Sequence, residues 1–448
     1  MNARVSAAAC RRVVAVFALV TSAAACHGLL DTTDPTLIRN QDIANATGAE
    51  GRRAALIQIW QRAFLSTTYY TALFSDEEAF DAPSVINYVQ NLDWTMDTRD
   101  TTAMQNNPQT DPVLSPQTKA FWTSTLAIYG LKAYGAKALK DDYIAQSYAL
   151  RAHIVVQMAE ALCPGFPLSD VDTETRPLYG KPLTTDSALT YALTQLDSSL
   201  TYVKDSTQFA NLARVLRGRV LLDLGRYADA AAAVASVPDD FTYAPEVIVS
   251  GNPFYNEYNT YVDPSTDVYM VGDREGTNGL AYVSEHDTIR IPVKYLGQRR
   301  SVPADSMFAQ AKYTDPATPI PTATGLEARL IAMEAAYHAN DPAWFTTLNT
   351  LRVRAGLAPV ATMPATDTGR VNLIFHERAF WLFRTGHRLG DMRRLLWRYH
   401  RDPITVFPTG NYPIFGLHYG PVTAIPYITK YSRNLNPNIT GGCSADQR

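Results

Sequence analysis

The chain has 448 residues, of which 46% are hydrophobic and 19% are charged. This is the composition of an ordinary globular protein, and the length allows a large buried core. The 40 basic and 43 acidic residues give a net charge of −3, and no basic block of the kind that follows a phosphate backbone is present, which argues against nucleic acid as a partner.

The first 25 residues have the pattern of an export signal. Three arginines precede an apolar run at 13–20 that is too short to span a bilayer. Small residues then lead to Cys26, as in a lipobox, where a peptidase cuts and the cysteine is acylated. Ala23 replaces the usual leucine, so a plain secretory cut near Cys26 stays open. We expect a signal peptide at 1–25, lipidation at Cys26 and a polar tether at 26–50.

Export also changes the charge and the cysteine count. Loss of residues 1–25 removes three arginines and no acidic residue, so the net charge changes from −3 to −6. With Cys10 removed and Cys26 lipidated, Cys163 and Cys443 remain. Two exported thiols can pair, which would remove about 4 kcal/mol of unfolded-state entropy, or they can stay as separate buried thiols. Neither has the spacing of a zinc or redox site.

Helical periodicity dominates residues 51–240. The apolar spacing predicts helices at 54–64, 119–139, 143–162, 186–202, 210–224 and 227–235. The helix at 143–162 is apolar on more than one face, so we expect it to lie between other helices. Thr184, Thr185 and Asp186 offer an N-cap to the helix at 186–202.

The last two of these helices carry a repeat-like pattern. The spacing is close to that of a tetratricopeptide repeat, although an ordinary helical hairpin can share it, and is set by Gly218, Leu221, Gly225, Tyr227, Ala230 and Val234. One repeat cannot bury its own face, so neighbouring hairpins must stack on it.

Between about 241 and 320 the helical period disappears, and Pro, Gly, Asn, Asp and Tyr become frequent. A segment of this length is more than a passive connector. It holds Tyr255, Tyr258 and Tyr261 among asparagines, followed by the polar string DREGTNGL at 273–280.

Helices return at 325–335, 344–352 and 371–399, and the tail after Pro403 is rich in loops. The most distinctive string is ERAFWLFRTGHRLGDMRR at 377–394, here called the signature segment. Its apolar residues form a core stripe, and Gly386 is expected to break or kink the helix. Asp391 can pair with His387 or Arg388 at helical spacing.

Taken in order, these strings resemble the SusD/RagB family of outer-membrane nutrient-binding proteins. The resemblance rests on the lipobox, the loop at Cys163, the repeat hairpin, the helix at 326–335, the signature segment and the Asn436-Pro437-Asn438 end. It implies a mainly α-helical fold with little β structure, in which tetratricopeptide-like hairpins form a scaffold with a loop-rich binding face. It also implies one domain at 51–448, with a helical scaffold at 51–240, a loop-rich insert at 241–320, and C-terminal helices and a tail at 321–448.

The resemblance further implies a function. Such a protein is held at the outer membrane by its lipid alone, faces the cell exterior, and binds oligosaccharides or other nutrients. It passes them to a SusC-like, TonB-dependent transporter and needs no cofactor. The alternative is a repeat-scaffold lipoprotein that binds only proteins.

Glu377, His387 and Asp391 of the signature segment are candidates for a metal or acid/base cluster. Charged side chains that flank an aromatic core more often form a buried ion-pair network that fixes the register of helices, and we favour that interpretation.

A second acidic string, Asp76-Glu77-Glu78 near Asp81, can be compared with the paired carboxylates of a glycosidase. Neighbouring carboxylates in sequence do not face each other across a substrate without a special turn, and in the family a similar string serves the architecture. The nucleophile elbow, the zincin motif and the P-loop are all missing from the sequence. We therefore expect no catalytic residue and no metal site, with a hydrolase as a further rival.

The aromatic and polar loops are the natural carriers of ligand binding. Flat rings stack on the apolar faces of sugars, while Asn, Asp and Arg bind their hydroxyl groups. The candidate ligand contacts are Tyr88, Asn91, Asp93, Trp94, Tyr255, Tyr258 and Tyr261. Packing beneath long loops, or contact with a protein partner, is the alternative use of these rings.

Overall fold

The computed structural model describes residues 44–81, 92–100, 113–245, 268–298, 306–315, 317–413, 417–427 and 436–439. The chain divides into two units, Met1–Asn45 and Ala46–Arg448, and every described helix and strand belongs to the second. The predicted signal peptide and Cys26 lie outside the described residues. The first described helix begins at Ala46, so residues 46–50 of the predicted tether are helical.

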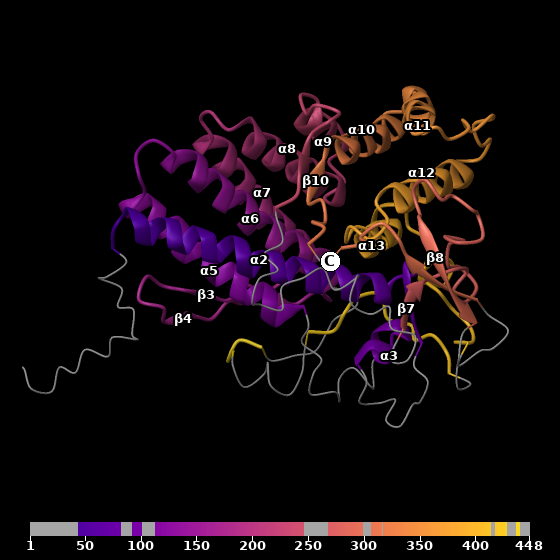
Figure 1. The fold of residues 1–448 in the computed structure, drawn as a ribbon, viewed down its shortest axis with the longest axis horizontal. Helices are drawn as coiled ribbons and strands as arrows, with labels where there is room; N and C mark the ends of the chain where they lie inside the picture. The colour runs from indigo at the N-terminus through magenta and orange to yellow at the C-terminus, as the bar shows by residue number, and fades with distance from the viewer. Residues whose placement is uncertain are drawn as a thin grey trace, which may run out of the picture. The chain divides into compact units, whose positions relative to one another are not determined.

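The first part of the fold is a series of long helices, each of which packs against the next along the chain (Figure 1). They are α2 (Ala46–Phe74), α5 (Leu114–Tyr134), α6 (Lys140–Ala161), α7 (Thr185–Tyr202) and α8 (Thr207–Asp223). As predicted, α6 lies between other helices and contacts α2, α5, α7 and α8. The N-cap of α7 is Thr184, whose hydroxyl accepts from the Ser187 backbone N–H at 3.1 Å.

The predicted repeat hairpin is formed by α8 and α9 (Tyr227–Val234). The two helices meet closely at Gly218, where an added Cβ would lie 2.5 Å from Cγ1 of Val234. Gly225 turns the chain between them with a φ of +73°. The ring of Tyr227 stacks on His338 of α10 (Gly325–His338), so this tyrosine contacts the next hairpin. That hairpin is completed by α11 (Ala343–Arg354), and α10 packs against α8, α9 and α11.

The strands of the described residues form five antiparallel pairs of two strands each. The pair β1 (Glu78–Asp81) and β7 (Val268–Val271) runs in the register Glu78 to Val271. The other pairs are β2 (Phe166–Pro167) with β5 (Pro182–Leu183), β3 (Asp170–Val171) with β4 (Pro177–Leu178), β6 (Thr242–Tyr243) with β10 (Ala323–Thr324), and β8 (Val293–Gln298) with β9 (Ser306–Gln310). The described part of the predicted loop-rich insert therefore contains strands.

The last helices are α12 (Asp367–Trp381) and α13 (Arg388–Arg398), followed by the short η3 (Pro403–Thr405). The single helical stretch expected at 371–399 is thus two helices. The helix is interrupted at Arg384 and Gly386, whose φ angles are positive, at 52° and 79° respectively. An added Cβ at Gly386 would lie 2.8 Å from Oγ1 of Thr68, so this turn also lets the chain approach α2 closely.

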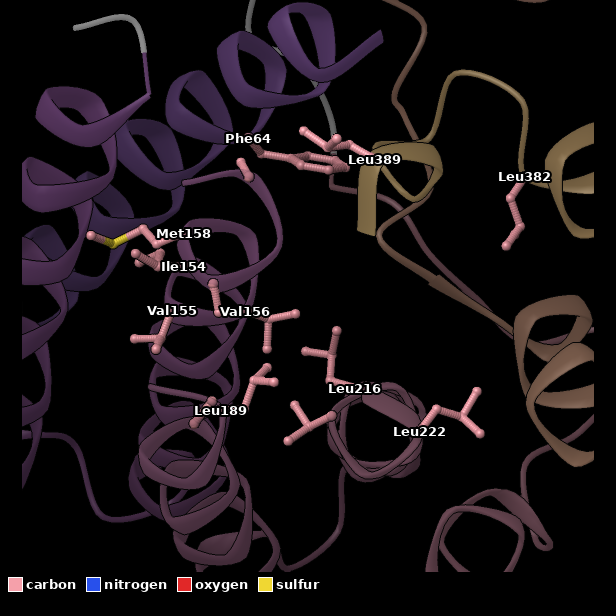
Figure 2. Close-up of a cluster of buried hydrophobic side chains, with 14 of the residues drawn as sticks. Phe64, Ile154, Val155, Val156, Met158, Leu189, Leu216, Leu222, Leu382 and Leu389 are labelled. Carbon is pink, nitrogen blue, oxygen red and sulfur yellow. The ribbon is translucent and has the colours of Figure 1, made fainter. Parts of the chain in front are cut away.

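One large hydrophobic cluster joins the scaffold to the signature segment. It includes Phe64 of α2, Val156 of α6, Leu216 of α8 and Leu389 of α13 (Figure 2). Because helices far apart in sequence share this core, the signature helices are held in a fixed position on the scaffold. Among the described helices, none has the length and apolar character needed to cross a bilayer.

Candidate functional site

The acidic string at 76–78 lies in the turn from α2 to β1, buried against the signature segment. Arg388 binds Asp76 through two hydrogen bonds of 2.6 and 2.8 Å. Glu77 accepts the backbone N–H of Arg384 at 2.9 Å, and Glu78 forms an ion pair with the same arginine at 2.8 Å. Burial raises the pKa of Glu77 to about 7. These three carboxylates hold the strained turn at Arg384 in place.

Asp391 is the centre of a second buried group of charges, although with partners other than those predicted. It accepts from Arg378 at 2.8 and 2.9 Å and from Arg394 at 2.8 Å. Burial would raise the pKa of Asp391, but the two guanidinium groups lower it well below its ordinary value. The prediction of His387 or Arg388 as its partner is wrong, because Arg388 reaches Asp76 and His387 lies 3.0 Å from Glu327.

Arg394 extends this network into the scaffold. Its guanidinium binds Glu334 of α10 at 2.9 and 3.0 Å and Asp223 of α8 at 2.8 Å. Glu377 is likewise paired with Arg290 at 2.7 Å. The charged residues of the signature segment therefore form the predicted buried ion-pair network. Within the described part of the chain, no group of His, Cys, Asp and Glu residues is placed to hold a metal ion.

A cavity of about 740 Å³, here called the signature cavity, opens beside this network. Its walls come from the 273–280 string, from α12 and α13, and from the residues that follow α13. Leu280 of the 273–280 string faces α12 and α13, and the Asn278 amide in the same string donates to the Phe407 carbonyl at 3.0 Å. This hydrogen bond ties the 273–280 loop to the segment after η3 and so closes one side of the cavity.

The signature cavity has an apolar floor and a polar rim. The apolar lining residues, here called the floor, are Leu280, Leu373, Phe375, Leu395 and Val406, and the buried Arg388, which is bound to Asp76, lies beside them. On the rim, the Thr368 hydroxyl and the Asn372 amide make no side-chain hydrogen bond within the described residues. The Arg401 guanidinium has one long bond of 3.4 Å to the Thr368 carbonyl. An apolar floor with unused donors and acceptors suits a ligand with flat apolar faces and many hydroxyl groups.

His376 adds a titratable group to the rim. It lies 3.0 Å from both carboxylate oxygens of Glu285, and its ring stacks on Phe380. Burial lowers the pKa of His376, but the hydrogen bonds to Glu285 and Glu377 outweigh this effect, so its pKa is raised above the ordinary value. The pair places a charge-assisted hydrogen bond at the edge of the cavity.

Comparison with known proteins identifies similar proteins by structure and not by sequence. No protein-family model matches the sequence, and a search of the curated proteins finds no match either. Among solved structures, a SusD superfamily protein of Bacteroides thetaiotaomicron matches with a TM-score of 0.69 and 12% identity, over 89% of this chain and 100% of that one.

Two further solved structures agree. Surface glycan-binding protein A of Bacteroides thetaiotaomicron has a TM-score of 0.62 and 12% identity, over 90% of this chain and 99% of that one. NanU of B. fragilis has a TM-score of 0.60 and 12% identity, over 93% and 100%. The chain has the SusD fold. The predicted mainly α-helical class is confirmed, and so is the resemblance at the level of the fold.

Most of the predicted ligand contacts lie outside the part of the chain that the structure describes, so they remain untested. Tyr88, Asn91, Tyr255, Tyr258 and Tyr261 lie outside the described residues. Asp93 and Trp94 belong to α3 (Leu92–Asp97). Their role in binding stays a prediction.

The predicted disulfide has a similar status. Cys163 is buried at the end of α6 and is disulfide-bonded. Cys443 lies outside the described residues, so the pairing of these two cysteines remains a prediction.

Sequence reasoning missed the polar rim of the signature cavity. Thr368, Asn372 and Arg401 flank the signature segment without belonging to it, and none stands in an aromatic cluster. The one available signal was the position of Asn372 beside the apolar stripe of α12, where an exposed amide borders buried residues.

Proposed function

We propose that this chain is a cell-surface lipoprotein that binds oligosaccharides and delivers them to a SusC-like, TonB-dependent transporter in the outer membrane. One observation carries the proposal. The SusD fold extends over about nine-tenths of the chain, and proteins that share it include a surface glycan-binding protein. Binding without chemical change also agrees with the use of the conspicuous carboxylates in ion pairs.

The signature cavity is the part of the described structure best suited to hold a sugar. Its volume of about 740 Å³ lies within the range of small-molecule sites, roughly 300–1,000 Å³. Asn372, Thr368 and Arg401 can bind hydroxyl groups while the apolar floor contacts a ring face. We therefore assign it one sugar-binding role, alongside the loops predicted from the sequence.

The direct test is a binding screen of the mature protein against panels of glycans and peptides. The proposal expects affinity for at least one class of oligosaccharide, measured by calorimetry, with no new reducing ends after long incubation. Binding of peptides or proteins alone would favour the alternative of a protein-binding scaffold. Release of reducing ends would favour a hydrolase.

The place of the protein is tested on intact cells. The proposal expects added protease to degrade the mature domain while a periplasmic marker stays intact. It also expects Cys26→Ser to release the protein from the membrane fraction. Full protection of the domain in intact cells, with degradation after the outer membrane is opened, would contradict delivery from the cell surface.

A further inference from the structure

A second cavity, of about 470 Å³, is lined by residues outside the signature segment. It is formed by the beginning of α5, the β3–β4 hairpin and the described residues at 436–439. We call it the α5 cavity. The groups that face it include Thr118, Lys119 and Trp122 of α5, Pro167, and Tyr179 of the hairpin.

The walls of the α5 cavity are connected by partly buried polar contacts. The indole N–H of Trp122 donates to the Ser169 carbonyl at 2.8 Å, which sets the ring against the hairpin. The next residue, Asp170, is bound by Arg151 at 2.7 Å and by Thr125 at 2.7 Å. Arg151 in turn lies 3.6 Å above the Phe121 ring. The hairpin is therefore anchored on α5 and α6 before any ligand arrives.

The residues at 436–439 fix the other side. The Asn436 amide donates to the Ser169 hydroxyl and to the Gly180 carbonyl, both at 3.0 Å. The Asn438 amide donates to the Tyr179 carbonyl at 3.0 Å. The Tyr179 carbonyl is thus bound by Asn438, while the residue as a whole stays 48% exposed. A rigid wall with an open aromatic ring is preorganised for binding, because little freedom remains to be lost.

Among its described lining residues, the α5 cavity has one charged side chain, that of Lys119. Lys119 is exposed at its rim, and its ammonium forms no ion pair with any described residue. Among the described residues that line the cavity there is no Asp or Glu, and the nearby Asp170 is already paired with Arg151. Because Lys119 lines the same cavity as Trp122 and Tyr179 and has no ionic partner among the described residues, it favours an anionic group on the ligand.

We propose that the α5 cavity is a separate saccharide subsite for a sugar ring that carries a carboxylate, as in a uronic acid. The ring face packs on Trp122 and Tyr179, and the carboxylate pairs with Lys119. This inference rests on the proposed carbohydrate binding and adds a second subsite with a charge preference.

The test uses the full mature chain and calorimetry at low salt. The probes are trimers of galacturonic, glucuronic and mannuronic acid, and the same trimers after carboxyl reduction, which keeps the ring and linkage but removes the charge. We expect at least one acidic trimer to bind about tenfold more tightly than its reduced form, with a difference that shrinks as salt is added. Lys119→Met should remove this difference, because the carboxylate of the acidic trimer loses its ionic partner.

The matched control is Lys137→Met, at an exposed lysine outside the cavity, which should change neither affinity. Tyr179→Ala should weaken both forms of the trimer, because stacking does not depend on the charge. Tyr179 is half exposed, so its loss does not threaten the fold, and a circular dichroism spectrum checks each variant.

Two outcomes would overturn the subsite. One is equal binding of every acidic trimer and its reduced form by the unaltered protein. The other is a charge preference that survives Lys119→Met. If the protein binds neutral glycans in the screen while either outcome holds, the proposed function stands and the subsite fails. If it binds no glycan at all, both fail.

Discussion

The signature segment and the α5 cavity use charge in opposite ways. In the signature segment, Asp391 and its arginines are buried and bound to one another. At the α5 cavity, Lys119 is exposed and has no ionic partner among the described residues. Charges that neutralise each other hold helices together, whereas a charge left open toward a cavity can hold a ligand. The charged residues that stand out most in the sequence are thus structural, whereas Lys119, the candidate ligand contact in the α5 cavity, belongs to no conspicuous motif.

The contrast between buried and exposed charges is tested most strongly by removing one partner of a buried ion pair. Arg388→Ala should lower the free energy of unfolding by about 3–5 kcal/mol, because Asp76 would be left charged in the interior. Urea denaturation measures the change. A loss below about 1 kcal/mol would mean that water reaches Asp76 and that the pair resembles a surface contact.

Two controls separate the charge from the packing. Arg217→Ala removes an ion pair with Asp197 whose two side chains are 26% and 54% exposed, so we expect a change of at most about 1 kcal/mol. The double variant Arg388→Met with Asp76→Asn removes both charges and should recover part of the lost stability. The amide oxygen of the substituted side chain could still accept the Leu280 backbone N–H that Asp76 accepts at 2.9 Å.

The same contrast explains how far the sequence could predict the structure. Apolar periodicity placed α7 and α9 within one residue at both ends, but α2 extends well beyond the predicted 54–64 on both sides, and α5 begins and ends five residues before the predicted 119–139. It could not assign Arg378 as a partner of Asp391, because helical spacing identifies only neighbours on one helix, such as the other partner Arg394. The partner Arg378 lies on α12, across the break at Gly386. The α5 cavity was beyond reach for the same reason, since it joins α5 to residues at 436–439.

The close contact between α8 and α9 in the scaffold is tested by adding a methyl group at Gly218. Gly218→Ala should destabilise the protein by about 1–3 kcal/mol, because the new Cβ would lie 2.5 Å from buried Val234 and 3.3 Å from Ile331. Gly51→Ala in α2 is the matched control, with nothing within 4 Å of its added Cβ. It should stabilise by about 0.5–1 kcal/mol through helix propensity. Thermal melts show whether each variant is more or less stable than the unaltered protein. If both variants changed stability in the same direction, the α8–α9 contact would be loose.

A further binding experiment tests whether the signature cavity and the α5 cavity act independently. Asn372→Ala should weaken binding of a neutral oligosaccharide about two- to tenfold, the effect of one hydrogen bond of roughly 0.5–1.5 kcal/mol. It should leave the charge preference assigned to Lys119 unchanged. Calorimetry with both variants measures this, and Gln208→Ala, at an exposed amide on α8, is the control. Loss of the charge preference in Asn372→Ala would mean that one ligand occupies both cavities.

The smallest expected effect lies at His376, where the two uses of charge meet, because this residue is paired with Glu285 and also faces the signature cavity. Since its pKa is raised in the fold, the charged imidazolium stabilises the protein at pH values below the unfolded pKa of about 6.5. That contribution is lost as the pH rises through the folded pKa. His376→Asn should therefore cost more stability at pH 6 than at pH 9, by about 1 kcal/mol or less. Denaturation at the two pH values, repeated in a Glu285→Gln background, isolates the pair. A cost that is equal at both pH values would assign His376 to stacking on Phe380 alone, and a pH-dependent cost that disappears with Glu285→Gln would assign it to the ion pair.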